Sequence, residues 1–203
     1  MCKSEDGVYV AVITFENDVL LKLSDEGKLV WAKGLKSEDE DFHPDLTAVT
    51  YGEGYIFAGG NFLAKIDPND GEVLWCKYPF SFGLIKNIWV PGDYVYVLDD
   101  DRIFKLDSQG NFTCVKEIEK DHHYIRLKSM HVSSDGIYVL GWVEDSAAIF
   151  MLDHDGNLRW AKRIAQRDLV LIPENIRVDG NIYIVGGLPK CKKLSRYLRS
   201  YEQ

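Results

Sequence analysis

Three consecutive aspartates are the densest group of side chains in this sequence that could do chemistry. Asp99, Asp100 and Asp101 lie between two apolar segments, so we expect them on a loop that joins two strands. Adjacent carboxylates on a loop are usually solvated, but loops at one end of a rigid scaffold also carry binding sites. The sequence therefore leaves two interpretations open, a solvated loop and a ligand-binding loop at these three residues.

Aspartate-rich turns suggest a second chemistry, the binding of calcium, in the segments DPNDG (67–71) and DHDGN (153–157). A dedicated calcium loop supplies about six to eight oxygen ligands from alternating acidic positions and a closing carboxylate. The second segment offers only Asp153 and Asp155, and the sequence LRW (158–160) follows soon after. Because Asp and Asn also favour tight turns without a metal, we interpret both segments as turns.

Other residue types that bind metals or act as nucleophiles form no recognisable pattern. His122 and His123 are adjacent and would point to opposite sides of an extended chain, which is a poor geometry for chelation. The four cysteines form no CxxC pair, which favours buried free thiols. No HExxH, Gly-x-Ser-x-Gly or phosphate-binding glycine segment occurs. The sequence therefore predicts no catalytic, cofactor-binding or metal-binding residue, and no cofactor.

The elements that must position these residues are copies of one repeat. Four segments share an apolar run, a polar turn ending in glycine, and a second apolar run closing on Trp-x-Lys: LLKLSDEGKLVWAK (20–33), LAKIDPNDGEVLWCK (63–77), IFKLDSQGNFTCVK (103–116) and IFMLDHDGNLRWAK (149–162). The turn glycines are 39 to 46 residues apart, and Cys114 replaces the tryptophan in the third copy. Each segment is predicted to be a tight hairpin. We expect its tryptophan to pack between neighbouring sheets, with the lysine stem along it.

Two further sets of short apolar segments recur with the same period. The set that contains a tyrosine is GVYVAV (7–12), GYIFAGG (54–60), DYVYVL (93–98), GIYVLG (136–141) and NIYIVGG (181–187). The set that precedes it is LTAVTY (46–51), IKNIWV (85–90), LKSMHV (127–132) and PENIRV (173–178). Their length and their Val, Ile and Tyr content favour strands. The unit thus has four strands, named A to D in chain order, and the first copy is predicted to lack strand A.

Four-stranded units repeated at this spacing are typical of a β-propeller. The sequence predicts one all-β domain over residues 1–203, a propeller of about five blades, with repeats at approximately 1–35, 45–80, 84–119, 125–165 and 170–203. A β-sandwich would not explain why the same Trp-x-Lys and Tyr positions recur. After residue 190 the pattern is lost. Either the N- and C-terminal segments share a blade, or a second copy or a further segment covers the open edges.

The charge balance limits the partners. The chain has 24 Lys and Arg against 32 Asp and Glu, a net charge of −8, which argues against duplex nucleic acid. No apolar run approaches the roughly 18 residues that span a bilayer, so no membrane insertion is expected. The first ten residues contain no apolar signal segment, which favours a cytoplasmic location, whereas removal of a signal would leave an extracellular one open. The acidic run 37–45 and the basic run 190–199 are predicted to be an exposed connector and a solvated tail.

The unit apolar-x-Leu-Asp-x-x-Gly-x-x-x-Trp-x-Lys, preceded by Gly-Tyr-Ile-x-Ala-Gly-Gly, resembles the quinoprotein-like (PQQ-type) propeller repeats of bacterial and archaeal proteins. The best match is EGYIFAGGNFLAKIDPNDGEVLWCKY (53–78), and the resemblance covers most of the chain. It implies a propeller, and relatives of this kind are mostly repeat scaffolds. It does not imply a quinone enzyme, because no segment here matches the calcium and cofactor site of the longer quinone-dependent dehydrogenases.

Three functions follow as hypotheses from these observations. The first is a non-catalytic scaffold that serves as a protein-interaction platform, because the repeat accounts for nearly every recurring residue. The second is a carbohydrate- or small-ligand-binding module with one aromatic pocket per blade. The third is an enzyme whose site lies at the mouth of the central channel and is built from loop carboxylates. Fold alone does not choose among them, and an oligomer is expected if the ring does not close within one chain.

Overall fold

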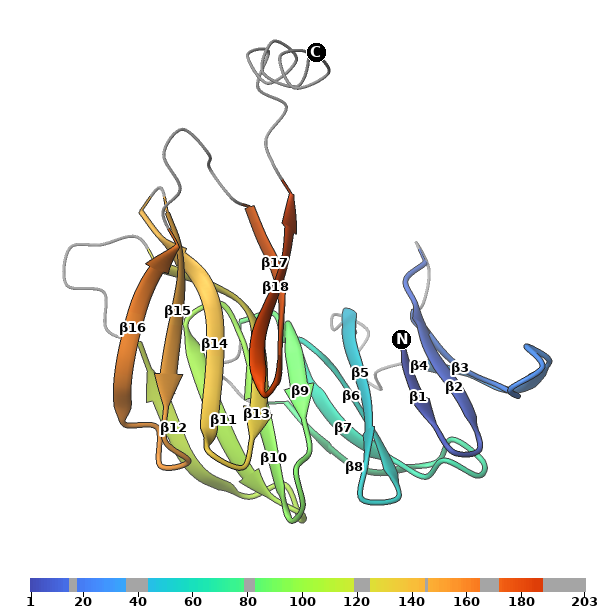
Figure 1. Ribbon diagram of the computed structural model, residues 1–203. Coiled ribbons are helices and arrows are strands. Elements are labelled where there is room, and N and C mark those ends of the chain that lie inside the picture. The colour runs from blue at the N-terminus through green and yellow to red at the C-terminus, as the bar shows by residue number, and fades with distance from the viewer. Residues whose placement is uncertain are drawn as a thin grey trace, which may run out of the picture.

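The computed structural model describes residues 1–14, 18–35, 44–78, 83–118, 125–144, 146–164 and 172–187. Every regular element in these ranges is a strand (Figure 1). The strands are β1 (Cys2–Ser4), β2 (Gly7–Val12), β3 (Asp18–Leu23), β4 (Leu29–Leu35), β5 (Leu46–Gly52), β6 (Tyr55–Gly60), β7 (Leu63–Ile66), β8 (Val73–Lys77), β9 (Asn87–Trp89), β10 (Tyr94–Leu98), β11 (Arg102–Asp107), β12 (Phe112–Glu117), β13 (Ile125–Ser133), β14 (Gly136–Val143), β15 (Ser146–Leu152), β16 (Leu158–Ile164), β17 (Ile172–Asp179) and β18 (Asn181–Gly187). None of the described elements is a helix long and apolar enough to cross a membrane.

The strands form four antiparallel sheets of four, β1–β4, β5–β8, β9–β12 and β13–β16, followed by the pair β17–β18. Each sheet is a simple meander in chain order, and each corresponds to one predicted repeat. The first strand of each sheet packs against the first strand of the next, so that β1, β5, β9, β13 and β17 form the inner row of the arc in Figure 1. This arrangement confirms the all-β propeller fold and the assignment of strands A to D.

The first sheet corrects one detail, since it does contain a strand A. Strand β1 pairs with β2 in antiparallel register, with Cys2 opposite Tyr9 and Ser4 opposite Gly7. The prediction missed this strand because three residues with one apolar side chain give no hydrophobic pattern. Local polar contacts hold the turn instead, since the Ser4 hydroxyl and the Tyr9 hydroxyl both donate hydrogen bonds to Asp6.

The hydrophobic core lies between successive sheets rather than within any one of them. One cluster joins Tyr9 and Leu20 of the first sheet to Leu46 and Ile56 of the second, and three similar clusters fill the later junctions. In the second to fourth sheets the B and C strands are mostly buried, whereas the D strands β4, β8, β12 and β16 are more exposed. Burial of apolar surface therefore stabilises the contacts between blades, as a propeller requires.

The described sheets do not close into a ring. Strands β17 and β18 pair with each other only, and no ladder of the described residues joins them to β1–β4. The predicted blade shared by both terminal segments is therefore not formed by these residues, and the number of blades stays a prediction. The basic run 190–199, His122, His123, Cys191 and most of the run 37–45 lie outside the described residues.

Candidate functional site

The inner strands carry a β-bulge at the same place in three blades. The register shifts at Thr47 in β5, at Lys128 in β13 and at Glu174 in β17. In the third blade Lys86, just ahead of β9, occupies the equivalent position. A bulge re-aims the side chain of the extra residue. These side chains reach across to the next blade: the Thr47 hydroxyl donates to the carbonyl of Ile85, and the Lys86 ammonium donates to the carbonyl of Leu127 at 2.9 Å.

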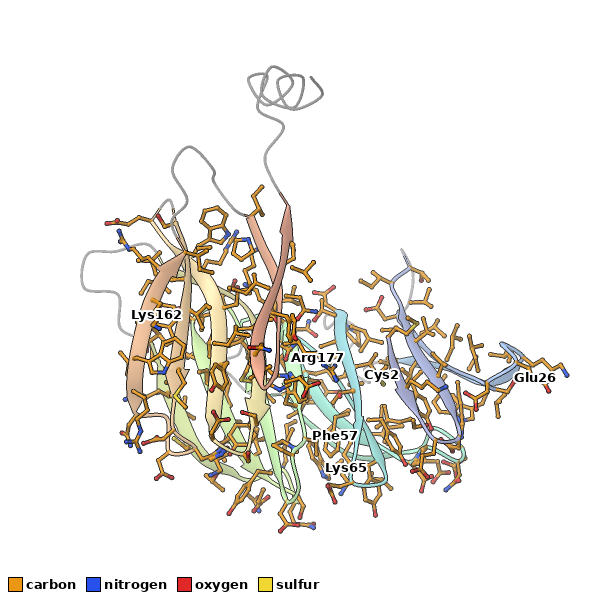
Figure 2. All side chains as sticks on the ribbon, viewed as in Figure 1. Cys2, Glu26, Phe57, Lys65, Lys162 and Arg177 are labelled. Carbon is orange, nitrogen blue, oxygen red and sulfur yellow. The ribbon has the colours of Figure 1, made fainter. Side chains whose placement is uncertain are left out.

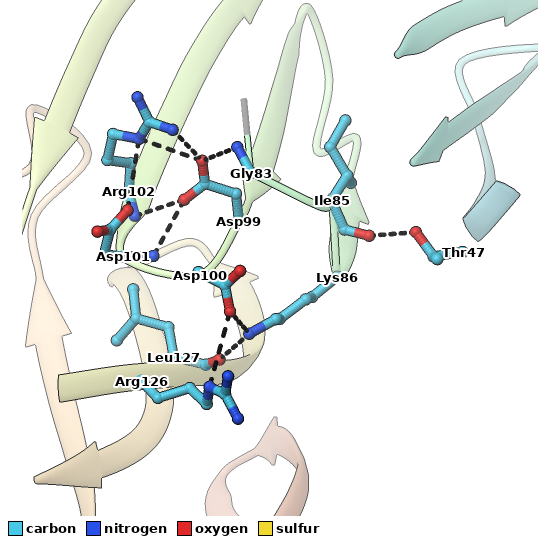
Figure 3. Close-up of polar contacts among 10 residues, drawn as sticks. All are labelled: Thr47, Gly83, Ile85, Lys86, Asp99, Asp100, Asp101, Arg102, Arg126 and Leu127. Carbon is cyan, nitrogen blue, oxygen red and sulfur yellow. Dashed lines mark hydrogen bonds and ion pairs between the residues drawn. The ribbon is translucent and has the colours of Figure 1, made fainter. Parts of the chain in front are cut away.

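Asp99, the first of the three consecutive aspartates, is fully buried in the turn between β10 and β11 (Figure 3). Its Oδ2 accepts hydrogen bonds from the Arg102 guanidinium at 2.7 and 3.1 Å and from the Gly83 amide at 3.0 Å. Its Oδ1 accepts from the backbone amides of Asp101 and Arg102 at 3.0 and 2.7 Å. A carboxylate with five donors from its own chain is bound as part of the turn.

Asp100 and Asp101 are less buried and are also paired with cations. Asp100 accepts a hydrogen bond from the Lys86 ammonium, and the Arg126 guanidinium lies 3.9 Å from the same carboxylate oxygen. Asp101 lies 3.5 Å from the Arg102 guanidinium. The Asp100 carbonyl also accepts the Leu127 amide of the next blade at 2.9 Å. The structure thus places the aspartates at the junction of the third and fourth sheets, and a ligand-binding role for them stays a prediction.

A cavity beside the inner strands has a volume of about 540 Å³. It lies where β1, β5, β9 and one residue of β17 meet, and Figure 2 labels two of its lining residues, Cys2 and Arg177. Its lining is Met1, Cys2, Lys3, Thr47, Ala48, Val49, Thr50, Tyr51, Lys86, Asn87, Ile88, Trp89 and Arg177. None of these described residues is acidic, although the whole chain has a net charge of −8. The aspartates Asp99–Asp101 are not among them.

The residues that line this cavity were not predicted from the sequence, although the sequence contains a signal for some of them. The aligned A segments place Thr50, Trp89, His131 and Arg177 at one equivalent position, and each is polar or aromatic within an apolar strand. In the structure Thr50, Trp89 and Arg177 line the cavity, whereas His131 is buried beside it. The sequence pattern marks this position of strand A, but it does not tell which of the four side chains face the cavity.

His131 sits beside this cavity and is almost entirely buried. It is 6% exposed, and its ring contacts that of Trp89 edge to face, with 4.3 Å between the ring centroids. Burial, with a further contribution from the Arg177 charge, lowers the pKa of His131 below its usual value. Among the described residues, its Nδ1 has no hydrogen-bond partner. The inner row therefore holds a buried imidazole next to the Arg177 guanidinium.

The aspartate-rich hairpins use their carboxylates as turn acceptors. Asp153 accepts the backbone amides of Asn157 and Asp155 at 2.8 and 3.1 Å, and it pairs with Arg159 at 3.1 Å. The Asn157 amide lowers the pKa of Asp153 through this hydrogen bond. Asp67 accepts the Asn69 amide at 2.8 Å in the same way. These donors account for the recurring aspartate in terms of turn geometry.

Trp31 and Trp75 pack between neighbouring sheets, as predicted, and their Trp-x-Lys pairs also cover the hairpin glycine of the following blade, which was not predicted. A β-carbon added at Gly71 would lie 2.7 Å from Lys33 Cγ and 3.2 Å from the Trp31 ring. The same addition at Gly110 would lie 3.1 Å from Lys77 and 3.2 Å from the Trp75 ring, and at Gly156 it would lie 3.3 Å from Lys116. The hairpin glycines therefore leave room for side chains of the preceding D strand.

A second lysine, in strand C, makes a periodic contact that the sequence analysis missed. Lys22, Lys65 and Lys105 donate to the carbonyls of Pro68, Ser108 and His154 at 3.0, 3.4 and 3.3 Å. Each acceptor directly follows the turn aspartate of the next hairpin. The sequence contained a signal for this contact, because a lysine recurs at one position of the otherwise apolar C strand in three copies. Met151 replaces this lysine in the fourth copy.

No protein-family model matches the sequence, and neither does any curated protein. Solved structures do match. The β-propeller domain of Cps50 (Swd1) from Myceliophteria thermophila is 15% identical with a TM-score of 0.63, and the match covers 88% of this chain and 63% of that one. A protein of unknown function from Bacteroides caccae is 15% identical with a TM-score of 0.58, covering 90% of this chain and 66% of that one.

Glutaminyl cyclase from Myxococcus xanthus is 10% identical with a TM-score of 0.52, and the match covers 90% of this chain and 82% of that one. The chain spans about two thirds of the length of the first two structures, at 63% and 66%. At these identities the likeness shows the fold alone. The chain is therefore similar to β-propeller proteins.

Proposed function

We propose that this chain is a non-catalytic β-propeller scaffold, built from quinoprotein-like repeats, that binds an acidic segment of another protein at its central cavity. The observation that carries the proposal is the convergence of Lys3, Lys86 and Arg177 on one 540 Å³ cavity from three different blades. In a chain with a net charge of −8, a concave region lined by cations attracts anions because the low-dielectric walls focus the field.

The three cations differ in how available they are. Lys86 is bound to Asp100, and Lys3 pairs with Asp25 at 3.2 Å in a contact where both side chains are exposed. Arg177 has no carboxylate partner among the described residues, and its guanidinium can bind a carboxylate through two parallel hydrogen bonds. We therefore expect Arg177 to contribute most to binding. Lys3 should come second, because its exposed ion pair with Asp25 is weak and a carboxylate of the ligand can replace Asp25.

The proposal is tested with a fluorescent twelve-residue peptide rich in glutamate, measured by anisotropy at low and at moderate salt. We expect Arg177→Glu to weaken binding about tenfold or more, since reversing one charge removes an ion pair and adds a repulsion. The matched control is Lys28→Glu, which makes the same charge change on an exposed hairpin outside the cavity. Equal affinities for wild type, Arg177→Glu and Lys28→Glu would contradict the proposal.

A second candidate, a small-ligand-binding module, is supported by the aromatic side chains of Tyr51 and Trp89 in the same lining. Aromatic faces next to amide and hydroxyl groups are the usual components of a small-ligand pocket. Isothermal titration with a panel of neutral sugars and small carboxylates separates the candidates. Binding of a sugar that survives Arg177→Glu would favour the small-ligand module over the acidic protein segment.

A further inference from the structure

His131, on the inner strand β13, is a titratable residue that lies next to the central cavity. It is 6% exposed, and its Nδ1 has no hydrogen-bond partner among the described residues. Buried polar atoms without a partner are uncommon in native proteins. Tyr138, opposite His131 in the ladder with β14, donates its hydroxyl to Asp135 at 2.5 Å. No hydrogen bond at Nδ1 fixes the protonation state of the imidazole, so burial and nearby charges decide it.

One position of strand A connects His131 to the cavity. In every described blade the residue at this position lies opposite an aromatic residue of strand B, and the five residues are Cys2, Thr50, Trp89, His131 and Arg177. All except His131 line the cavity, and Figure 2 labels two of them, Cys2 and Arg177. The His131 ring contacts the uncharged Trp89 ring of β9, with 4.3 Å between the centroids. His131 thus lies directly behind the wall of the cavity.

The charged groups around His131 oppose one another. Burial, followed by the positive charge of Arg177 on β17, lowers the pKa of His131 below its usual value. The carboxylates of Asp135, in the turn between β13 and β14, and of Asp179, on β17, favour the protonated ring instead. The strands β9 and β14 face the ring with the two aromatic residues named above. An anion that pairs with Arg177 therefore shifts this balance towards the protonated imidazole.

We propose that the binding of an acidic segment at the central cavity is coupled to the uptake of a proton by His131. This inference rests on the proposed function, because the anion is the one expected at Arg177. A bound carboxylate offsets the charge that opposes protonation, whereas Asp135 and Asp179 continue to favour it. Because the complex then holds the proton more readily than the free chain, linkage requires that the affinity rise as the pH falls. His131 does not line the cavity, so it acts through Arg177 rather than by contact with the ligand.

The test measures the affinity of the full chain for the glutamate-rich twelve-residue peptide, by anisotropy, from about pH 7.5 to about pH 5.5. Glutamate has an ordinary pKa of about 4.3, so the peptide stays largely charged in this range. We expect binding about threefold or more tighter at the acidic end, since uptake of one proton changes the affinity by at most about tenfold per pH unit. Titration calorimetry in buffers of different ionisation enthalpy measures the uptake directly, and we expect a net uptake of protons on binding.

His131→Gln is the first variant, because it removes the titrating group, and it should lose the rise in affinity towards acidic pH. The matched control is His154→Gln on the hairpin between β15 and β16, outside the cavity lining, which should keep the rise. Asp179→Asn is the second variant. It keeps the imidazole and Arg177 but removes one charge that favours protonation, so the rise should be smaller than in the wild type. Circular dichroism at both ends of the pH range confirms that each variant is folded.

The outcomes separate this proposal from the proposed function. Peptide binding that depends on Arg177 but does not strengthen towards acidic pH would overturn the coupling and leave the proposed function in place. So would an equal rise in the wild type and in His131→Gln, or binding without net proton uptake. Absence of peptide binding at every pH would overturn both proposals.

Discussion

The junction of the second and third sheets and the junction of the third and fourth make the same two bonds with different chemistry. In one, the Gly60 carbonyl accepts the Ile85 amide at 2.9 Å and the Thr47 hydroxyl donates to the Ile85 carbonyl. In the other, the Asp100 carbonyl accepts the Leu127 amide at 2.9 Å and the Lys86 ammonium donates to the Leu127 carbonyl. Both junctions satisfy the backbone groups of the residue directly before the bulge position of the inner strand segment, Ile85 before Lys86 and Leu127 before Lys128.

The two junctions differ in how closely the backbone segments at their turns approach each other. A β-carbon added at Gly60 would lie 1.1 Å from the Asp45 carbonyl oxygen, so this turn has no room for a side chain. The other turn holds the buried Asp99, which needs Arg102 to balance its charge. The comparison teaches that the fold requires the two backbone bonds, and that either close packing or a paired charge can support them.

The largest loss of stability is expected when the junction of the second and third sheets receives an aspartate, the residue type that the junction of the third and fourth sheets carries. Gly60→Asp should destabilise the fold by about 3 kcal/mol or more, because the new side chain overlaps the backbone at Asp45. Chemical denaturation followed by tryptophan fluorescence measures the change. Gly34→Asp is the control, since nothing lies within 4 Å of a β-carbon added there. Similar loss of stability in both variants would show that steric overlap is not the cause.

A smaller but still large effect is expected at the charged junction. Asp99→Ala should destabilise the fold by about 3 kcal/mol, because it leaves the partly buried Arg102 guanidinium and the Gly83 amide without their acceptor. The same denaturation experiment applies, with Asp93→Ala on an exposed turn as control. If Asp99→Ala were as stable as the control, the turn would not depend on this carboxylate.

The smallest expected effect is a loss of stability at low pH. It concerns the junction of the first and second sheets. There Lys22 donates to Asp6 at 2.7 Å and to the Pro68 carbonyl at 3.0 Å, whereas Lys65 at the second junction lies 3.7 Å from the Tyr55 ring centroid. The hydrogen bond from Lys22 lowers the pKa of Asp6 from 3.8 to about 2. A carboxyl with a lowered pKa in the folded state stabilises the fold above its unfolded pKa.

That contribution should therefore be lost as the pH falls from about 4 to about 2. Asp6→Asn should flatten the pH dependence of stability in this window, measured by urea denaturation at several pH values. The change should be modest, because the Asp6 side chain is about half exposed to solvent, at 49%. An unchanged pH profile would mean that Lys22 is held by the Pro68 carbonyl alone.

Much of the fold could be predicted because its signals are local and repeated. The hairpin glycines, the Trp-x-Lys pairs and the tyrosine strands each recur with one period, so three weak signals combine into a strong one. Strand β1 was missed because three residues carry no such pattern, and its pairing depends on contacts around Asp6. The propeller was predictable, whereas the shortest strand was not.

The candidate site was much less predictable than the fold. Asp99, Asp100 and Asp101 look alike in the sequence, but their side chains are 0%, 47% and 25% exposed, and Asp100 pairs with Lys86 whereas Asp99 and Asp101 lie against Arg102. The central cavity depends on Lys3, Lys86 and Arg177, which are scattered over the whole chain. Only the packing of the inner strands β1, β5, β9 and β17 around one cavity brings them together.

The amino-acid sequence by itself determined the repeat, the strand order within each blade and the acidic net charge, because turns, alternation and composition act over a few residues. The tertiary structure decided which charges meet. Burial, bulges and contacts between blades depend on residues about forty positions apart, and their effect appears only when the sheets pack.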